Sequence, residues 1–145
     1  MKHTPACQGN RPMPHYYDVL IRETHIDGLG HMNNAAYLTL FEEARWDWIT
    51  AGGYGMREIQ QYKQSPVILE AHVKFLREVR LREKIRIVSE ILSYTGKVGD
   101  LRQVMQRPDG TVCCEALFKM GFFDLRARRL IDPTPLWRQA LGLPE

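Results

Sequence analysis

One long apolar segment, residues 25–53, constrains the fold more than any other part of this sequence. From Tyr37 to Ala51, apolar side chains recur at three- and four-residue steps, the spacing of an α-helix. Asn33 and Asn34 precede this pattern as favourable N-cap residues, and a Gly-Gly pair ends it. Because few polar residues interrupt the apolar surface, neighbouring elements must cover the helix on most sides, and a strongly curved sheet can do this.

The rest of the sequence predicts strands joined by short turns. We expect strands over residues 16–26, 67–75, 85–92, 100–107 and 111–123, because apolar and polar side chains alternate there. Short turn signals between the last three make the sheet largely antiparallel. A cystatin-like fold has the same order of elements but leaves the outer face of its helix in water. The nearly all-round apolar helix therefore predicts an α+β hotdog fold, a long central helix wrapped by a five-stranded antiparallel sheet.

Length and composition favour one domain. With 145 residues, 44% of them hydrophobic, the chain is long enough for one core and too short for two. We expect residues 1–14 to be a mobile N-terminal lead-in and residues 15–145 to form a single hotdog domain. The net charge of +3 is small for a nucleic-acid binder, and we expect no signal peptide and no membrane span. Three cysteines make a disulfide framework improbable, so the sequence predicts a cytoplasmic protein.

The loop before the helix carries a motif, Asp27-Gly28-Leu29-Gly30-His31-Met32-Asn33-Asn34, followed by Tyr37 and by Glu43-Ala44-Arg45. This pattern resembles the 4-hydroxybenzoyl-CoA thioesterase-like hotdog family, especially its fatty acyl-CoA thioesterase branch. The similarity extends over roughly residues 16–132. The chain departs from the family at residues 77–84, a largely charged stretch where many relatives have a proline and a Gly-Asp turn.

The resemblance implies an acyl-CoA thioesterase that releases free acid and coenzyme A, acting on medium or long fatty acyl or aryl groups without a bound cofactor. Asp27 would be the catalytic carboxylate, as general base or nucleophile. Backbone N–H groups around Asn34, at the positive end of the helix, would polarise the thioester carbonyl. Gly28 and Gly30 would let the loop turn sharply. His31 either carries a proton or fixes the loop.

Each of these residues also has a purely structural explanation. Asp27 can hydrogen-bond to its own turn, as loop aspartates do, and Asn33 and Asn34 can act only as helix caps. The spacing of His25, Asp27 and His31 matches no strong zinc signature, so we predict no metal site.

The candidate substrate-binding residues are Asn33, Tyr37, Arg77 and Lys97. Arg77 begins a basic run that either meets the phosphates of coenzyme A or forms a solvated strand edge, and Lys97 lies in a Gly-Lys turn. Helix aromatics such as Tyr37 are core residues by their spacing, although part of the set can line an acyl pocket. Glu42 and Glu43 are the alternative carboxylates, because some hotdog thioesterases place the catalytic group on this helix.

The resemblance further implies a site between subunits, hence a homodimer or homotetramer, with acyl-CoA as the partner molecule. Two other functions remain open from the sequence. One is a hotdog enoyl-CoA hydratase or dehydratase using His31 close to Asp27. The other is a non-catalytic module that binds acyl-CoA without turnover. A cystatin-like inhibitor would need a Gln-x-Val-x-Gly hairpin, which the sequence lacks.

Overall fold

The structure is a computed structural model that describes residues 12–144. In chain order the elements are β1 (His15–Leu20), the 3-10 turn η1 (Glu23–His25), α1 (Asn34–Ala51), α2 (Met56–Tyr62), β2 (Gln64–Phe75), β3 (Lys84–Thr95), β4 (Val98–Gln106), β5 (Val112–Asp124), β6 (Arg129–Ile131) and α3 (Pro135–Ala140). The strands pair antiparallel in the order β1-β3-β4-β5-β2, with β6 on β5. Most of the predicted lead-in lies outside the described residues.

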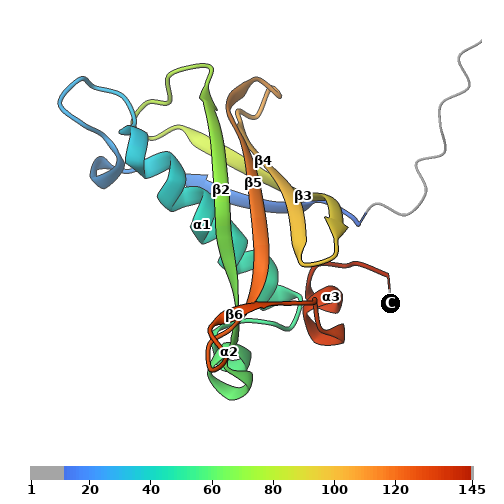
Figure 1. The fold of residues 1–145 in the computed structure, drawn as a ribbon. Coiled ribbons are helices and arrows are strands. Elements are labelled where there is room, and N and C mark those ends of the chain that lie inside the picture. The colour runs from blue at the N-terminus through green and yellow to red at the C-terminus, as the bar shows by residue number, and fades with distance from the viewer. Residues whose placement is uncertain (1–11, 145) are drawn as a thin grey trace, which may run out of the picture.

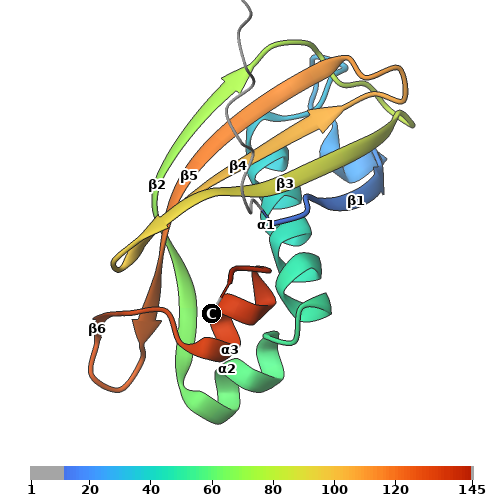
Figure 2. The same cartoon turned by 90° about the vertical axis from the view of Figure 1, so that its right-hand side faces the viewer.

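The sheet curves around α1, which runs along its concave side (Figures 1 and 2). The buried face of α1 consists of Tyr37, Leu40, Phe41, Ala44, Trp48 and Ile49. It packs on the inner face of β5, where Phe41 and Phe118 meet edge to face with ring centroids 6.1 Å apart. The predicted α+β architecture, with a long helix wrapped by an antiparallel sheet, is therefore confirmed.

The helix begins and ends close to the predicted residues. Asn33 is the N-cap, and its Oδ1 accepts a hydrogen bond from the Ala35 amide at 2.8 Å. Asn34 is not a cap but the first helical residue, and Gly52 is the C-cap. The buried side chain of Gln103 in β4 donates a hydrogen bond to the Phe41 carbonyl at 3.0 Å and accepts one from the Arg45 guanidinium at 2.9 Å. These bonds fix the position of α1 on the sheet.

Two features of the fold differ from the sequence prediction. The first strand ends at Leu20 instead of extending to residue 26, because η1 follows it. A sixth strand, β6, pairs with β5, whereas the sequence predicts only five strands. At the C-terminal end, α3 packs against the core as a short amphipathic helix and buries Trp137 completely.

The strand β2 has one open edge within the described part of the sheet, since its only strand partner there is β5. Its register shifts between Ile68 and Glu70, so Leu69 is a bulge residue. The strand prediction for residues 67–75 is confirmed, but its single apolar face is interrupted by this bulge. Ile68, Leu69 and Phe75 are 40%, 44% and 50% exposed, so an apolar strand edge faces outward. Among residues 12–144 no helix is long and apolar enough to cross a bilayer.

Candidate active site

The loop between η1 and α1 is a short closed turn. Ile26 and Met32 form an antiparallel bridge, and the Asp27 amide donates to the His31 carbonyl at 3.2 Å. The Met32 amide donates to the Val79 carbonyl at 2.7 Å, which ties the loop to the segment after β2. The loop therefore holds the backbones of Asp27 and His31 side by side at the start of α1.

Only one of the two glycines in the motif needs to be glycine for its backbone conformation. Gly30 has a φ of +86°, in the left-handed region, whereas Gly28 is not among the glycines with positive φ. Gly28 also lies in this turn, but its backbone conformation does not require glycine. A Cβ on Gly28 would meet no atom within 4 Å.

We expect Gly30→Ala to lower the free energy of unfolding by about 1–2 kcal/mol, because an L-residue is strained at this φ. Gly28→Ala is the matched control and should unfold at the wild-type temperature. Thermal denaturation of the two variants measures the difference. Equal stability of both would show that the turn adopts another conformation.

The carboxylate of Asp27 is half-buried and is oriented by its own turn. Its Oδ1 accepts a hydrogen bond from the Leu29 amide at 2.8 Å, which is the local bond expected of a loop aspartate. Oδ2 accepts no hydrogen bond from any residue in 12–144. One carboxylate oxygen thus sets the orientation of the group and the other remains available.

The start of α1 adds a hydrogen-bond donor beside this loop. The N-cap residue Asn33 accepts two hydrogen bonds. Its side-chain Oδ1 accepts from the Ala35 amide, and its backbone carbonyl accepts from the Ala36 amide. The amide of Asn34 has no acceptor in the described part of the chain, as is usual for the first residue of a helix. An unpaired N–H group at the positive end of a helix favours developing negative charge.

A small cavity of about 200 Å³ opens in front of this helix start. It is lined by His31, Met32, Asn34, Tyr37, Phe75, Leu76, Arg77 and Glu78. Four of the predicted site residues therefore line the same cavity: His31 from the loop, Asn34 and Tyr37 from α1, and Arg77 from the segment after β2. Asp27 lies in the same loop but does not line the cavity. Phe75, whose ring packs edge to face on Tyr37 at 5.0 Å, was not predicted, although it ends the period-two pattern of its strand.

Lys97 does not join these residues in the structure. Its turn between β3 and β4 lies beside Gly121 of β5, whereas the cavity lies near Phe75, which pairs with Cys114. Seven residues of an extended strand span about 23 Å. The sequence placed Lys97 near the basic run, but the strand register puts it at the opposite end of the sheet.

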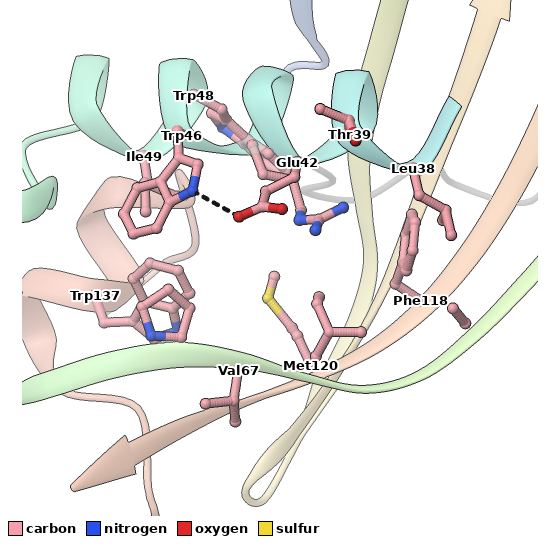
Figure 3. A pocket seen from close by; sticks show the side chains of 14 residues that line it. Leu38, Thr39, Glu42, Trp46, Trp48, Ile49, Val67, Phe118, Met120 and Trp137 are labelled. Carbon is pink, nitrogen blue, oxygen red and sulfur yellow. Dashed lines mark hydrogen bonds between the residues drawn. The ribbon is translucent and has the colours of Figure 1, made fainter. Parts of the chain in front are cut away.

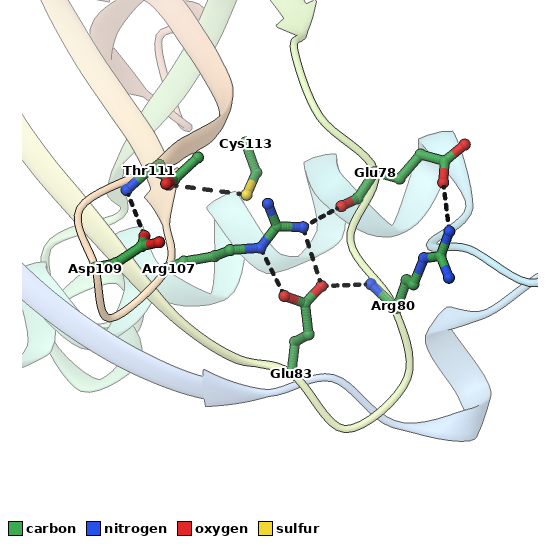
Figure 4. Close-up of polar contacts among 7 residues, drawn as sticks. All are labelled: Glu78, Arg80, Glu83, Arg107, Asp109, Thr111 and Cys113. Atoms are coloured by element: carbon green, nitrogen blue, oxygen red, sulfur yellow. Dashed lines mark hydrogen bonds and ion pairs between the residues drawn. The ribbon is translucent and has the colours of Figure 1, made fainter.

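The charged stretch at residues 77–84 is held in place by Arg107, the residue that follows β4 (Figure 4). The Arg107 guanidinium donates to Glu83 Oε1 at 2.7 Å and to the Glu78 carbonyl at 2.6 Å. Glu83 also accepts from the Arg80 amide at 2.7 Å, and the Arg107 hydrogen bond holds the pKa of Glu83 below its usual value. Ion pairs neutralise three members of the predicted basic run, Arg80, Arg82 and Arg86. Arg77, in contrast, lines the cavity.

We expect Arg107→Gln to lower the free energy of unfolding at pH 7 by about 1–2 kcal/mol, because partly buried hydrogen bonds to Glu83 are lost. The pKa of Glu83 is lower in the folded protein than in the unfolded chain, where it is about 4. Ionised Glu83 therefore stabilises the fold at pH values above the unfolded pKa, and this stabilisation is lost as the pH falls through the folded pKa. The difference from wild type should therefore shrink below about pH 4. Urea denaturation at several pH values measures it. Arg126→Gln is the exposed control, and an equal loss in it would refute the role of the Glu83 pair.

A second, larger groove follows α1 away from the loop (Figure 3). Its volume is about 470 Å³, and it lies between α1, β2 and β5. Leu38, Glu42 and Trp46 of α1 form one side, and Trp137 of α3 stands at one end (Figure 3). Trp46 Nε1 donates to Glu42 Oε1 at 3.3 Å. Sequence reasoning missed Trp137, because no local pattern connects the C-terminal segment to the central helix.

The curved sheet around one helix and the loop at the helix start are features of hotdog-fold thioester hydrolases. The chain belongs to the Thioesterase-like superfamily, whose family model matches residues 20–141. It is similar to the long-chain acyl-CoA thioesterase FadM of Escherichia coli K12, with 29% identity covering 78% of this chain and 86% of FadM. The predicted family and thioester hydrolase activity are therefore confirmed.

Solved structures support the same assignment. The probable thioesterase YbaW from Escherichia coli superposes with a TM-score of 0.77 at 27% identity, covering 88% of this chain and 96% of YbaW. A Staphylococcus aureus protein solved in complex with CoA gives a TM-score of 0.84 at 19% identity, covering 92% and 88%. A 1,4-dihydroxy-2-naphthoyl-CoA thioesterase from Synechocystis gives 0.81 at 13% identity, covering 89% and 96%. The last two similarities establish the fold alone.

Proposed function

We propose that this thioesterase hydrolyses acyl-CoA, with medium or long fatty acyl groups as substrates and aryl-CoA as the alternative. The observation that supports this proposal best is the Asp27 carboxylate, with Oδ2 unpaired, in the loop that leads directly into α1, whose first amide, that of Asn34, has no acceptor in residues 12–144. Hydrolysis of a thioester needs a base or nucleophile for the carbonyl carbon and a donor for the carbonyl oxygen. The similarity to a long-chain acyl-CoA thioesterase supports the choice of substrate.

In the proposed reaction the thioester carbonyl oxygen accepts the Asn34 N–H, and negative charge on that oxygen is stabilised as the carbonyl carbon becomes tetrahedral. Asp27 either removes a proton from water, so that hydroxide adds to the carbon, or attacks the carbon itself to give a mixed anhydride that water then hydrolyses. In both cases the C–S bond breaks and coenzyme A leaves as the thiolate. His31 fixes the loop beside this carboxylate, and Gly30 makes the turn that positions it.

Binding of coenzyme A is assigned to the residues around the cavity mouth. Arg77 would pair with a phosphate, Asn33 would contact the pantetheine chain, and Tyr37 would pack against the thioester end. Lys97 is far from these residues in its own subunit, so we propose that it approaches the coenzyme A bound to a second subunit.

We also propose a homodimer in the cytoplasm as the smallest active unit, with pairing of dimers into a homotetramer as the next level. The exposed apolar edge of β2 supports the dimer, because an open strand edge favours pairing with a second copy. Pairing along β2 would extend the sheet across both subunits and close the open side of the cavity.

Release of free thiol from a panel of acyl-CoAs tests the proposal. We expect turnover with saturated acyl-CoAs and no requirement for added metal. Turnover of enoyl-CoA but of no saturated acyl-CoA would indicate a hydratase. Tight acyl-CoA binding without thiol release would indicate a binding module, and either result would overturn the proposed reaction.

A further inference from the structure

The small cavity and the larger groove lie along one stripe of α1. Asn34 lines the cavity, and Leu38, Glu42 and Ile49 line the groove, at the four- and seven-residue spacings that share a helix face. The strand β2 also borders both spaces, because it contributes Phe75 to the cavity and residues 66–68 and 71 to the groove. A substrate that begins at the helix start would therefore continue along α1 into the groove.

The far end of this path is closed by a rigid aromatic wall. Trp137 is fully buried, and its ring stacks on Phe122 with centroids 5.1 Å apart and planes parallel to within 1°. Its Nε1 donates to the Tyr94 hydroxyl at 3.3 Å. The backbones of α1 and α3 also touch, because a Cβ on Gly52 would collide with the Ala140 carbonyl. The wall thus cannot move away without unpacking α3 from α1.

The two charged side chains in the groove already have partners in the protein. Glu42 accepts from Trp46, while the Arg45 guanidinium donates to Gln103 and lies 4.6 Å from the centroid of the Phe118 ring. The other lining groups are mainly aromatic and aliphatic side chains. Such a surface suits an alkyl chain, which gains affinity from each methylene removed from water.

From these observations we propose that the groove holds the acyl chain of the substrate and that Trp137 sets its maximum length. This inference rests on the proposed acyl-CoA hydrolysis. Tyr37 at the cavity and Ile49 near the wall are about 18 Å apart along the helix axis, at about 1.5 Å per residue. An extended alkyl chain advances about 1.3 Å per carbon, from a C–C bond of about 1.5 Å. The path therefore accommodates straight chains of about 12 to 14 carbons.

The test is the dependence of kcat/KM on chain length for straight saturated acyl-CoAs from 6 to 18 carbons. For the wild type we expect kcat/KM to rise by up to about fourfold per methylene and to stop rising at 12 to 14 carbons. Val67→Trp fills the groove from β2, so its optimum should fall by at least four carbons. Trp137→Phe keeps a stacked ring but leaves a gap, so its optimum should move up by one or two carbons.

His72→Trp is the matched control, since His72 lies on the same strand but does not line the groove. It should keep the wild-type optimum. A flat chain-length profile, or an optimum that Val67→Trp does not shift in correctly assembled protein, would overturn the role of the groove. Absence of thiol release from every acyl-CoA would instead overturn the proposed function itself, so the two failures are distinguishable.

Discussion

We expect Asp27→Asn to lower kcat for acyl-CoA hydrolysis by a factor of about 10³ or more. Asparagine has the same shape and retains an oxygen that can accept the Leu29 N–H, so the loop should keep its conformation. What is lost is the negative charge, and with it the ability to take a proton from water or to attack the carbonyl carbon. Because asparagine has the same size and keeps the hydrogen bond from Leu29, binding of substrate should change little.

Initial rates of thiol release give kcat, and binding of a thioether analogue that cannot be hydrolysed gives the affinity. Glu42→Gln is the control, because it removes the alternative carboxylate on α1 while leaving the loop intact. A Glu42→Gln variant that loses activity, beside an active Asp27→Asn variant, would move the catalytic role to the helix. A tenfold or greater loss of analogue binding in Asp27→Asn would mean that the residue shapes the cavity rather than performing chemistry.

The elements that the sequence predicts correctly are those specified by neighbouring residues. The start of α1 follows from an N-cap whose side chain bonds two residues ahead, and its core face follows from the repeat that contains Phe41 and Trp48. The turns at Gly96 and Gly110 have the positive φ that their glycines suggest. The loop motif likewise identifies residues that are adjacent in the chain and therefore adjacent in space.

The features that sequence reasoning misses depend on contacts between distant segments. The register shift at Leu69 is a property of the β2–β5 pair, and an alternating pattern in one strand does not reveal it. Trp137 reaches the groove only because α3 packs on the end of α1, about ninety residues earlier in the chain. Lys97 appears close to the basic run in the sequence but lies at the other end of the sheet, because β3 and β4 are long strands.

The second large effect is expected at the open edge of β2. We expect Leu69→Asp to convert the assembled enzyme into a folded monomer with at most about 1% of wild-type activity, on the proposal that β2 pairs with its copy. Leu69 is 44% exposed, so one subunit should tolerate the aspartate. In an interface with twofold symmetry the same change occurs twice, which places two like charges near each other and removes two apolar contacts. Activity should fall with assembly, because the proposed site lies between subunits.

Light scattering at the assay concentration gives the mass, circular dichroism the fold, and thiol release the activity of the same sample. Leu117→Asp is the matched control: Leu117 of β5 is similarly exposed, at 42%, but lies away from the open edge. The Leu117→Asp protein should remain dimeric. If it loses only the ability to form tetramers, the contact between dimers lies on the outer face of the sheet. A Leu69→Asp protein that stays dimeric, or a monomer with full activity, would rule out β2 pairing as the basis of the active site.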